Sequence, residues 1–238
     1  ITKHKKGYFL ECEKKIIDEL FIKLNSYKFR SKVEILNLSN EFVVAVLSRE
    51  KFLTLENSKN ILGYTTKFRE DPIYLDPRHK DLGARLITNL EKLHLSLKLL
   101  ELKSSNLDEY YSVSNKLGIP QTNTDKLQNN LFGIECNLNE LNGIDFKKGC
   151  YVGQENTARI KLKDKLSKRL FPVEVIEGDL SKDNIIHHEN TELGKVLIND
   201  KFPFAIVKFK DKNFKFEKIF KCGSASVKIK KPYWFKFD

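Results

Sequence analysis

The last third of the chain carries a series of short strand-like segments, and this series constrains the fold more than any other feature. From about residue 168, β-branched and aromatic residues gather in runs at residues 171–176, 193–198, 205–209, 214–220 and 225–229. Glycine, aspartate, asparagine and lysine separate these runs, as is usual for tight turns. Short strands at such regular spacing are typical of a small antiparallel barrel. We therefore predict a β-barrel domain at residues 166–238.

The preceding residues, 1–165, read as an α+β domain. Residues 7–13 resemble a short strand, and apolar side chains then recur at helical spacing between residues 16 and 24. Residues 32–38 and 41–47 alternate or run apolar, which predicts two strands joined by a turn. A chain of 238 residues exceeds the roughly 150 typical of one domain, so this division into two domains fits its length.

Two more elements are predicted before the boundary. Apolar residues at several spacings predict strand-rich structure over residues 86–100. Asn106 is a favourable first residue for a helix. That helix is expected to end at Gly118, with Pro120 just beyond, because this pair is the usual helix-ending chemistry.

The chain is basic, with 43 lysines and arginines against 32 acids and a net charge of +11. Such an excess suits nucleic acid, an anionic ligand or an acidic partner protein. The lysines are scattered along the whole length, however, which favours a solvated surface. No apolar run approaches the roughly 20 residues of a membrane helix, and no secretory signal opens the chain. We therefore expect a soluble intracellular protein.

An octapeptide is the strongest functional signal. Residues 148–155 read Lys-Gly-Cys-Tyr-Val-Gly-Gln-Glu, so that Cys150 follows two adjacent lysines and is flanked by glycines. Thiols beside cations favour the thiolate, the form that attacks electrophiles and binds metals. Cys150 is therefore the candidate functional thiol. Gln154 and Glu155 either brace this loop or contact a ligand.

The other cysteines and the histidines do not predict a metal site. No Cys-x-x-Cys pair or close Cys/His spacing suggests closed zinc coordination. His187 and His188 would face opposite sides of a strand, so they could not easily share a metal. Structural disulfides are not expected in an intracellular chain. We expect Cys12, Cys136 and Cys222 to be ordinary small core residues.

Several short motifs occur in one order along the chain. They are Asp76-Pro77-Arg78, Leu82-Gly83-Ala84-Arg85, Gly118-Ile119-Pro120, the octapeptide followed by Ala158-Arg159, and finally Pro232 and Trp234. In this order the motifs resemble the YgfZ-type folate-binding family, relatives of the glycine-cleavage aminomethyltransferase, or T protein. The octapeptide is highly specific for that family, and the Asp-Pro-Arg and Leu-Gly-x-Arg elements are moderately specific. The resemblance covers nearly the whole chain.

The resemblance implies both a fold and a role. The implied fold is an aminomethyltransferase-like ring of ferredoxin-like α+β modules with a carboxyl-terminal antiparallel β-barrel, built around a folate pocket. The implied role is the maturation of iron–sulfur enzymes with tetrahydrofolate as ligand, and it affects tRNA modification indirectly. The implied partners are A-type iron–sulfur carrier proteins and client apo-enzymes. No direct nucleic-acid or membrane contact is expected, and the chain is expected to be a monomer.

The resemblance also assigns ligand roles to residues outside the octapeptide. The guanidinium forks of Arg78 and Arg85 suit the carboxylates of a folate glutamate tail, unless these arginines form ion pairs within the protein. Glu135 stands where relatives carry a carboxylate for the pterin N–H groups, although their preceding proline is absent here. Tyr110 or Tyr111 falls where relatives offer an aromatic ring to folate. The alternative for both tyrosines is the core of their helix.

Within the octapeptide, the resemblance implies that Cys150 transiently ligates the iron of a cluster shared with a partner, or exchanges with a partner thiol. One thiolate cannot hold a cluster alone, so a second protein or folate must contribute. The remaining motif residues carried over are Lys148, Gly149, Tyr151, Gly153, Gln154, Glu155 and Arg159. Arg159 is expected to pair with an acid or with the ligand.

The chain departs from the family pattern in two places. Residues 163–165 read Lys-Asp-Lys, where relatives have a basic stretch ending in Arg-Gly, so we expect a different turn into the barrel. The chain also begins at Ile1 without the segment that precedes this point in family members. That segment supplies part of the ring wall, so we expect an incomplete amino end and weaker folate binding.

The leading hypothesis is therefore a non-catalytic, folate-binding maturation factor for iron–sulfur enzymes. The alternative enzyme is a tetrahydrofolate-dependent aminomethyltransferase, which needs a carboxylate placed to handle the substrate amine. No such aspartate can be assigned from the sequence. A third hypothesis, a basic RNA-binding module, depends on charge alone. We expect a bacterial cytoplasmic location, with the mitochondrial matrix as the alternative.

Overall fold

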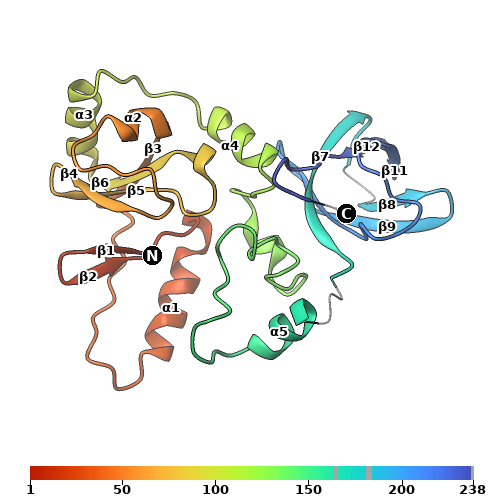
Figure 1. Ribbon diagram of the computed structural model, residues 1–238, viewed down its shortest axis with the longest axis horizontal. Coiled ribbons are helices and arrows are strands. Elements are labelled where there is room, and N and C mark those ends of the chain that lie inside the picture. The colour runs from red at the N-terminus through yellow and green to blue at the C-terminus, as the bar shows by residue number, and fades with distance from the viewer. Residues whose placement is uncertain (163–165, 181–183, 237–238) are drawn as a thin grey trace. The chain divides into compact units, whose positions relative to one another are not determined.

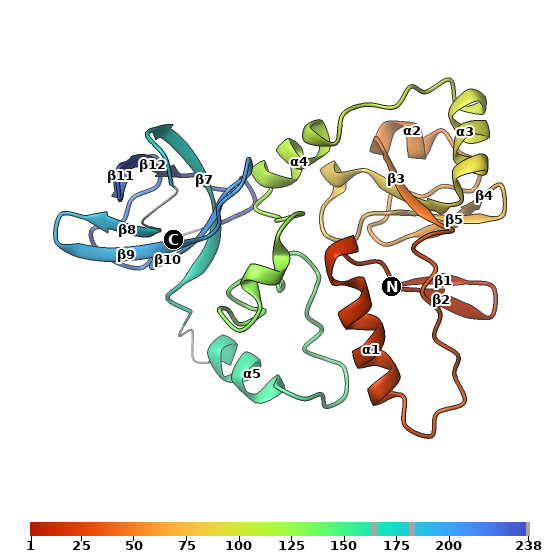
Figure 2. The same cartoon turned by 180° about the vertical axis from the view of Figure 1, so that it is seen from behind.

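The computed structural model describes residues 1–162, 166–180 and 184–236. The chain forms two compact units, Ile1–Asn106 and Leu107–Asp238. Each unit has its own sheets and helices (Figures 1 and 2). The division at residue 106 differs from the sequence boundary at 165, because residues that precede the barrel pack with it in unit 2. The turn predicted at residues 163–165 lies outside the described residues.

Unit 1 is a mixed α+β structure with two antiparallel sheets. Its elements are β1 (Thr2–His4), β2 (Gly7–Phe9), η1 (Lys14–Ile16), α1 (Ile17–Tyr27), β3 (Val43–Leu47), α2 (Arg49–Leu53), β4 (Thr65–Phe68), β5 (Asp71–Leu75), η2 (Lys80–Leu82), β6 (Ala84–Thr88) and α3 (Leu90–Leu99). Strands β1 and β2 form a hairpin, and the larger sheet has the order β3-β6-β5-β4. In Figure 1, α2 and α3 lie on one side of the larger sheet and the hairpin lies on the other.

The core of unit 1 lies between α2 and the larger sheet. Phe52 of α2 is completely buried and packs against apolar side chains from one face of β5 and β6, among them Ile73 and Leu86. Both helices on this face begin at side-chain caps, because the Ser48 hydroxyl accepts from the Lys51 N–H and the Asn89 amide oxygen accepts from the Lys92 N–H.

The sequence predicted part of unit 1 correctly. The helix between residues 16 and 24 and the strand at 41–47 are confirmed as α1 and β3. The strand predicted at 32–38 is wrong, since that segment pairs with no neighbouring strand. The strand-rich prediction for 86–100 holds only to Thr88, and α3 follows. The Asn89 cap starts that helix in a stretch whose apolar spacing is ambiguous.

Unit 2 begins with three short helices, α4 (Leu107–Lys116), η3 (Thr124–Leu127) and α5 (Gln154–Leu162). Helix α4 ends as predicted in a left-handed glycine, because Gly118 has φ +71°. The Ile119 N–H donates to the Ser114 carbonyl and the Gly118 N–H donates to the Asn115 carbonyl, the two bonds of a Schellman motif. This hydrogen-bonded ending explains the Gly-Ile-Pro motif.

Pro232 and Trp234 hold this helix end against the barrel domain. A Cβ added to Gly118 would lie 2.8 Å from Cγ of Pro232, so only glycine fits. The indole Nε1–H of Trp234 donates to the Leu117 carbonyl at 2.8 Å. The Gly-Ile-Pro motif and the residues Pro232 and Trp234 therefore belong to one structural joint within unit 2.

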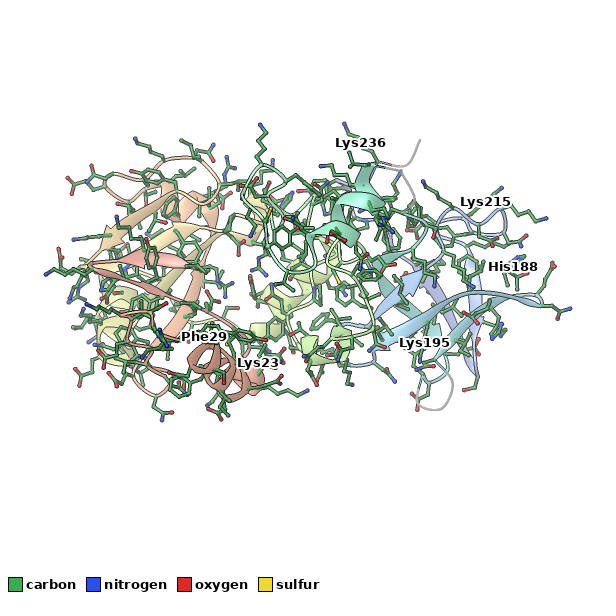
Figure 3. All side chains as sticks on the ribbon, turned by 90° about the horizontal axis from the view of Figure 1, so that it is seen from below. Lys23, Phe29, His188, Lys195, Lys215 and Lys236 are labelled. Carbon is green, nitrogen blue, oxygen red and sulfur yellow. The ribbon has the colours of Figure 1, made fainter. Side chains whose placement is uncertain are left out.

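The predicted carboxyl-terminal barrel is confirmed. Its strands are β7 (Arg169–Glu177), β8 (Ile185–His188), β9 (Thr191–Ile198), β10 (Phe204–Val207), β11 (Ile219–Cys222) and β12 (Ala225–Ile229). The described strands close antiparallel in the order β10-β7-β12-β11-β8-β9. Lysines such as Lys195 and Lys215 project from the outer surface (Figure 3).

Aromatic rings fill the barrel. Phe171 is completely buried and makes edge-to-face contacts with Phe209, Phe216 and Phe235 at centroid distances of 5.1–6.3 Å. The strand predicted at 214–220 is wrong in its first part, because β11 begins only at Ile219. The preceding segment is a loop whose phenylalanines still enter the core.

No helix in the described part of the chain is long and apolar enough to cross a membrane.

Candidate functional site

Cys150 is exposed and lies in the loop that precedes α5. Helix α5 is labelled in Figure 1. The side-chain oxygen of Gln154, the first residue of α5, accepts the Tyr151 N–H at 3.0 Å, and the Gln154 N–H donates to the Tyr151 carbonyl at 3.2 Å. Of the two roles considered for Gln154, the structure shows bracing of the loop. Gly153 has φ +86° and so needs its glycine, whereas Gly149 has no such conformation.

Two cation–π contacts tie lysines to this loop. The Lys148 ammonium lies 4.5 Å from the ring centre of Tyr151. On the other side of Cys150, the Lys161 ammonium lies 3.7 Å from the ring of Phe146 and 3.2 Å from Oδ1 of Asn139. Because residue 161 is in α5 and residue 146 precedes the cysteine, the second contact closes the loop at its base. Glu155 and Arg159 are exposed on α5.

A buried polar cluster fixes the segment that leads into this loop. Asn137 is completely buried, and its amide donates to the Leu170 carbonyl of β7 at 2.8 Å. Arg169 of β7 donates to Asn137 at 2.9 Å and to Glu140 at 2.6 Å. The barrel therefore supports the Cys150 loop through β7. The sequence reasoning did not identify Asn137, Lys161 or Arg169, because isolated polar residues carry no sequence signal of their tertiary partners.

The other cysteines differ from Cys150 in exposure. Cys222 is completely buried in the barrel, as predicted. Cys12 and Cys136 are only half-buried rather than core residues. Burial, and to a lesser extent the neighbouring Glu135 carboxylate, raises the pKa of the Cys136 thiol to about 11. Burial also raises the pKa of Cys12, with a smaller contribution from Glu13.

Potential metal ligands do not gather around Cys150. Across the described ranges, no three histidine, cysteine, aspartate or glutamate side chains lie close enough together to hold a metal ion. His187 and His188 are neighbours in strand β8, where successive side chains point to opposite faces of the sheet.

The Asp-Pro-Arg motif forms an ion pair within unit 1. Asp76 is completely buried. Its Oδ1 accepts from the backbone N–H of Arg78 at 2.9 Å and from Nε at 3.0 Å, and its Oδ2 accepts from a terminal guanidinium nitrogen at 2.7 Å. This bidentate arrangement uses the geometry that suits a carboxylate best. For Arg78, the structure shows the ion-pair alternative.

Arg85 is held in the same way by a different carboxylate. Its Nε donates to Oε2 of Glu11 at 3.0 Å, and a terminal nitrogen pairs with Oε1. The Tyr74 hydroxyl donates to the same Oε2 at 2.7 Å. The Leu-Gly-x-Arg motif is completed by Gly83, where an added Cβ would lie 2.1 Å from the Leu47 carbonyl oxygen. Both arginine motifs are therefore architectural within unit 1.

The remaining predicted ligand residues lie in unit 2. Oε2 of Glu135 accepts the Phe132 N–H at 2.9 Å. The Tyr110 hydroxyl accepts from the Gln121 amide at 3.1 Å. Tyr111 meets Phe202 edge-to-face at 6.2 Å. Both tyrosines are half-buried, which agrees with a packing role in the α4 joint.

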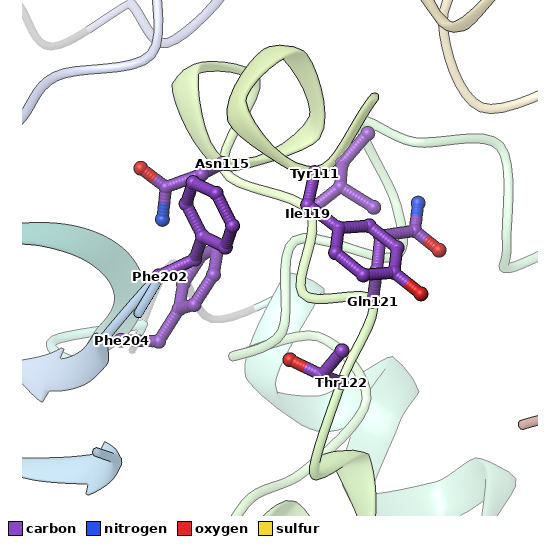
Figure 4. Close-up of a pocket in the computed structure, with 7 residues that line it drawn as sticks. All are labelled: Tyr111, Asn115, Ile119, Gln121, Thr122, Phe202 and Phe204. Atoms are coloured by element: carbon purple, nitrogen blue, oxygen red, sulfur yellow. The ribbon is translucent and has the colours of Figure 1, made fainter. Parts of the chain in front are cut away.

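Tyr111 also lines a small pocket beside α4 (Figure 4). The other lining residues are Asn115, Ile119, Gln121, Thr122, Phe202 and Phe204. The cavity volume is about 10 Å³, roughly the space of one water molecule. A pterin needs a far larger site. Within the described residues of each unit, the predicted ligand side chains contact protein groups, and the small pocket beside α4 does not fit a folate.

Comparison with known proteins finds several mitochondrial iron–sulfur cluster assembly factors. No protein-family model matches the chain. The chain is similar to the mitochondrial iron–sulfur cluster assembly factor IBA57 of Mus musculus, with 32% identity over 181 residues, 75% of this chain and 48% of that protein. It is similar to the Homo sapiens factor, with 30% identity over 72% of this chain and 46% of that protein.

The homologous assembly factor of Dictyostelium discoideum is 28% identical over 76% of this chain and 44% of that protein. The chain therefore spans just under half the length of these curated relatives. Their names agree with the predicted resemblance to proteins of iron–sulfur maturation. A relation to the aminomethyltransferase is not among these findings.

Proposed function

We propose that this chain belongs to the family of these assembly factors and acts in iron–sulfur cluster assembly through Cys150. One observation carries the proposal. Cys150 is the exposed cysteine of the described chain, displayed on a loop that Gln154 and Lys161 brace, while Cys12, Cys136 and Cys222 are half or fully buried. A thiol that is both accessible and held in place is suited to ligation or exchange with another molecule.

The proposed mechanism follows from the small number of ligands. Cys150 supplies one thiolate, and a cluster iron needs further ligands that the described residues do not gather around it. The cluster is therefore cargo, held between Cys150 and a partner rather than bound as a resident group. The proposed partners are A-type carriers and client apo-enzymes. The compartment in the relatives' names favours the mitochondrial matrix over the bacterial cytoplasm.

The central test replaces the thiol without disturbing the fold. Cys150→Ser is expected to lower the activity of cluster-dependent enzymes in cells at least tenfold. Its midpoint of urea unfolding should stay the same, because the side chain is exposed. Cys12→Ser, in unit 1, is the matched control and should leave client activity unchanged. Wild-type client activity in the Cys150→Ser strain would refute the thiolate role.

Tetrahydrofolate binding, the aminomethyltransferase-like ring and the indirect effect on tRNA modification are further parts of the proposal. They are supported by the resemblance of the motifs, while the paired states of Arg78, Arg85 and Glu135 count against folate within either unit. No step of the mechanism uses folate. Calorimetric titration with tetrahydrofolate measures binding directly. Release of ammonia from aminomethyl-lipoyl protein would instead favour the aminomethyltransferase alternative.

A further inference from the structure

The tip of the Cys150 loop carries an exposed apolar side chain beside the exposed thiol. Val152 is fully exposed, two residues from the thiol, and Leu162 at the other end of α5 is 85% exposed. Phe146, at the base of the loop, is 37% exposed even though Lys161 covers part of its ring. Burial of apolar surface is favourable, and side chains in such positions are buried only when a partner covers them.

Exposed cations precede and follow this tip in the sequence. Residues 145–162 contain four basic side chains, Lys147, Lys148, Arg159 and Lys161, against the two carboxylates of Asp145 and Glu155. All four cations are exposed, and we call them the basic collar. Two of them are held beside the loop by the cation–π contacts with Tyr151 and Phe146. Because these two lysine side chains are positioned in advance, they lose less conformational entropy when a partner binds.

We infer that the loop is a docking tip for an acidic partner protein. The partner places Val152 in a small apolar pocket and pairs its carboxylates with the basic collar. This docking deepens the proposed function, on which it rests, because it brings the partner's ligands to Cys150. A protein fits better than nucleic acid. Single-stranded nucleic acid is bound by stacking of its bases on flat rings. Here the Tyr151 ring is covered by Lys148, and the projecting residue is a branched aliphatic.

The charge distribution favours the same partner over a membrane surface. Binding to an interface needs a broad apolar face on a helix, whereas α5 carries Glu155, Arg159 and Lys161 and has no buried residue. A single aliphatic anchor within a charged rim is instead the usual anatomy of a protein interface. Charge complementarity would mainly speed association, and the apolar anchor would slow dissociation.

The test measures binding of purified A-type carrier protein to the full chain by biolayer interferometry. Val152→Asp should weaken binding at least tenfold, because it places a charge in the apolar pocket. Lys147→Glu/Lys148→Glu should slow association about tenfold at low salt, with a smaller effect at high ionic strength. Lys212→Glu/Lys215→Glu on the exposed barrel surface is the matched charge control and should bind like the wild type.

Each other outcome is informative. Wild-type affinity for Val152→Asp, or equal loss in the barrel control, overturns the docking tip. Stronger binding of the wild type to tRNA, or to vesicles of phosphatidylcholine and cardiolipin, with loss in Val152→Asp overturns the protein partner. Cys150→Ser should still dock but fail to support client enzymes. If Cys150→Ser supports clients while Val152→Asp fails to dock, the thiolate role is lost and the docking tip stands. If Val152→Asp docks normally while Cys150→Ser is inactive, the reverse holds.

Discussion

The turn at residues 76–85 and the loop at residues 146–155 contain the most recognisable motifs of the chain. The motif side chains of the turn are paired within the protein, whereas those at the tip of the loop are exposed to solvent. In the turn, Asp76 is completely buried, and Arg78 and Arg85 are paired with carboxylates of unit 1. In the loop, Cys150 and Val152 are exposed. A motif in a sequence therefore marks constraint without saying whether the constraint comes from the fold or from a partner.

The glycines of the two regions sharpen this comparison most. At Gly83, φ is +72° and ψ is −150°, and an added Cβ would lie 2.1 Å from a carbonyl oxygen of β3. Gly83→Ala should therefore lower the free energy of unfolding by more than about 4 kcal/mol. At Gly149 nothing lies within 4 Å of an added Cβ, so Gly149→Ala should change it by less than about 1 kcal/mol. Urea unfolding measures both, and equal effects would break the comparison.

The carboxylates give a second, smaller contrast. Asp76→Asn removes the buried negative charge of the ion pair with Arg78. It should lower the free energy of unfolding in urea by about 3 kcal/mol. Glu155→Gln in the loop removes an exposed charge near the start of α5 and should cost less than about 1 kcal/mol. A large loss in Glu155→Gln alone would mean that the loop, rather than the turn, is the architectural region.

Titration of the Cys136 thiol in unit 2 gives the smallest expected effect on stability. Burial raises the pKa of Cys136 from 9.0 to about 11, so the folded state binds its proton more tightly than the unfolded state. That contribution to stability is complete below pH 9 and is lost as the pH rises toward 11. Wild-type protein should therefore lose about 1–2 kcal/mol more than Cys136→Ala between pH 9 and 11, after allowance for the partial exposure of the thiol. Parallel loss in both proteins would mean that Cys136 does not titrate in this range.

The sequence reasoning identified the elements whose patterns are local. The barrel was predictable because strand-like runs alternate with turn residues, and the end of α4 because Gly118 and Pro120 carry helix-ending chemistry. Strand β8 was missed because its two histidines interrupt the apolar pattern. Helix α3 was misread because its apolar residues suit either period, and only the Asn89 cap decides between them.

The site divides in the same way. The octapeptide identified Cys150 and its loop, since those residues are contiguous. The supports of the loop were not predictable, because the contacts of Asn137 with β7 and of Lys161 with Phe146 join residues distant in sequence. The pairing of Arg85 with Glu11, 74 positions away, was equally hidden. Such contacts exist only once the tertiary fold has formed, and no periodicity records them.

The bond from Trp234 to the Leu117 carbonyl has a consequence for the order in which unit 2 forms during synthesis. The two residues are 117 positions apart. A ribosome adding about 5–20 residues per second needs roughly 6–23 s to cover that interval. For that time the end of α4 lacks both the indole donor and the Pro232 contact, and the barrel it rests on is incomplete. The segment that carries Cys150 therefore leaves the ribosome before the joint at the end of α4 can close, and a nascent chain exposes this thiol before unit 2 has its final geometry.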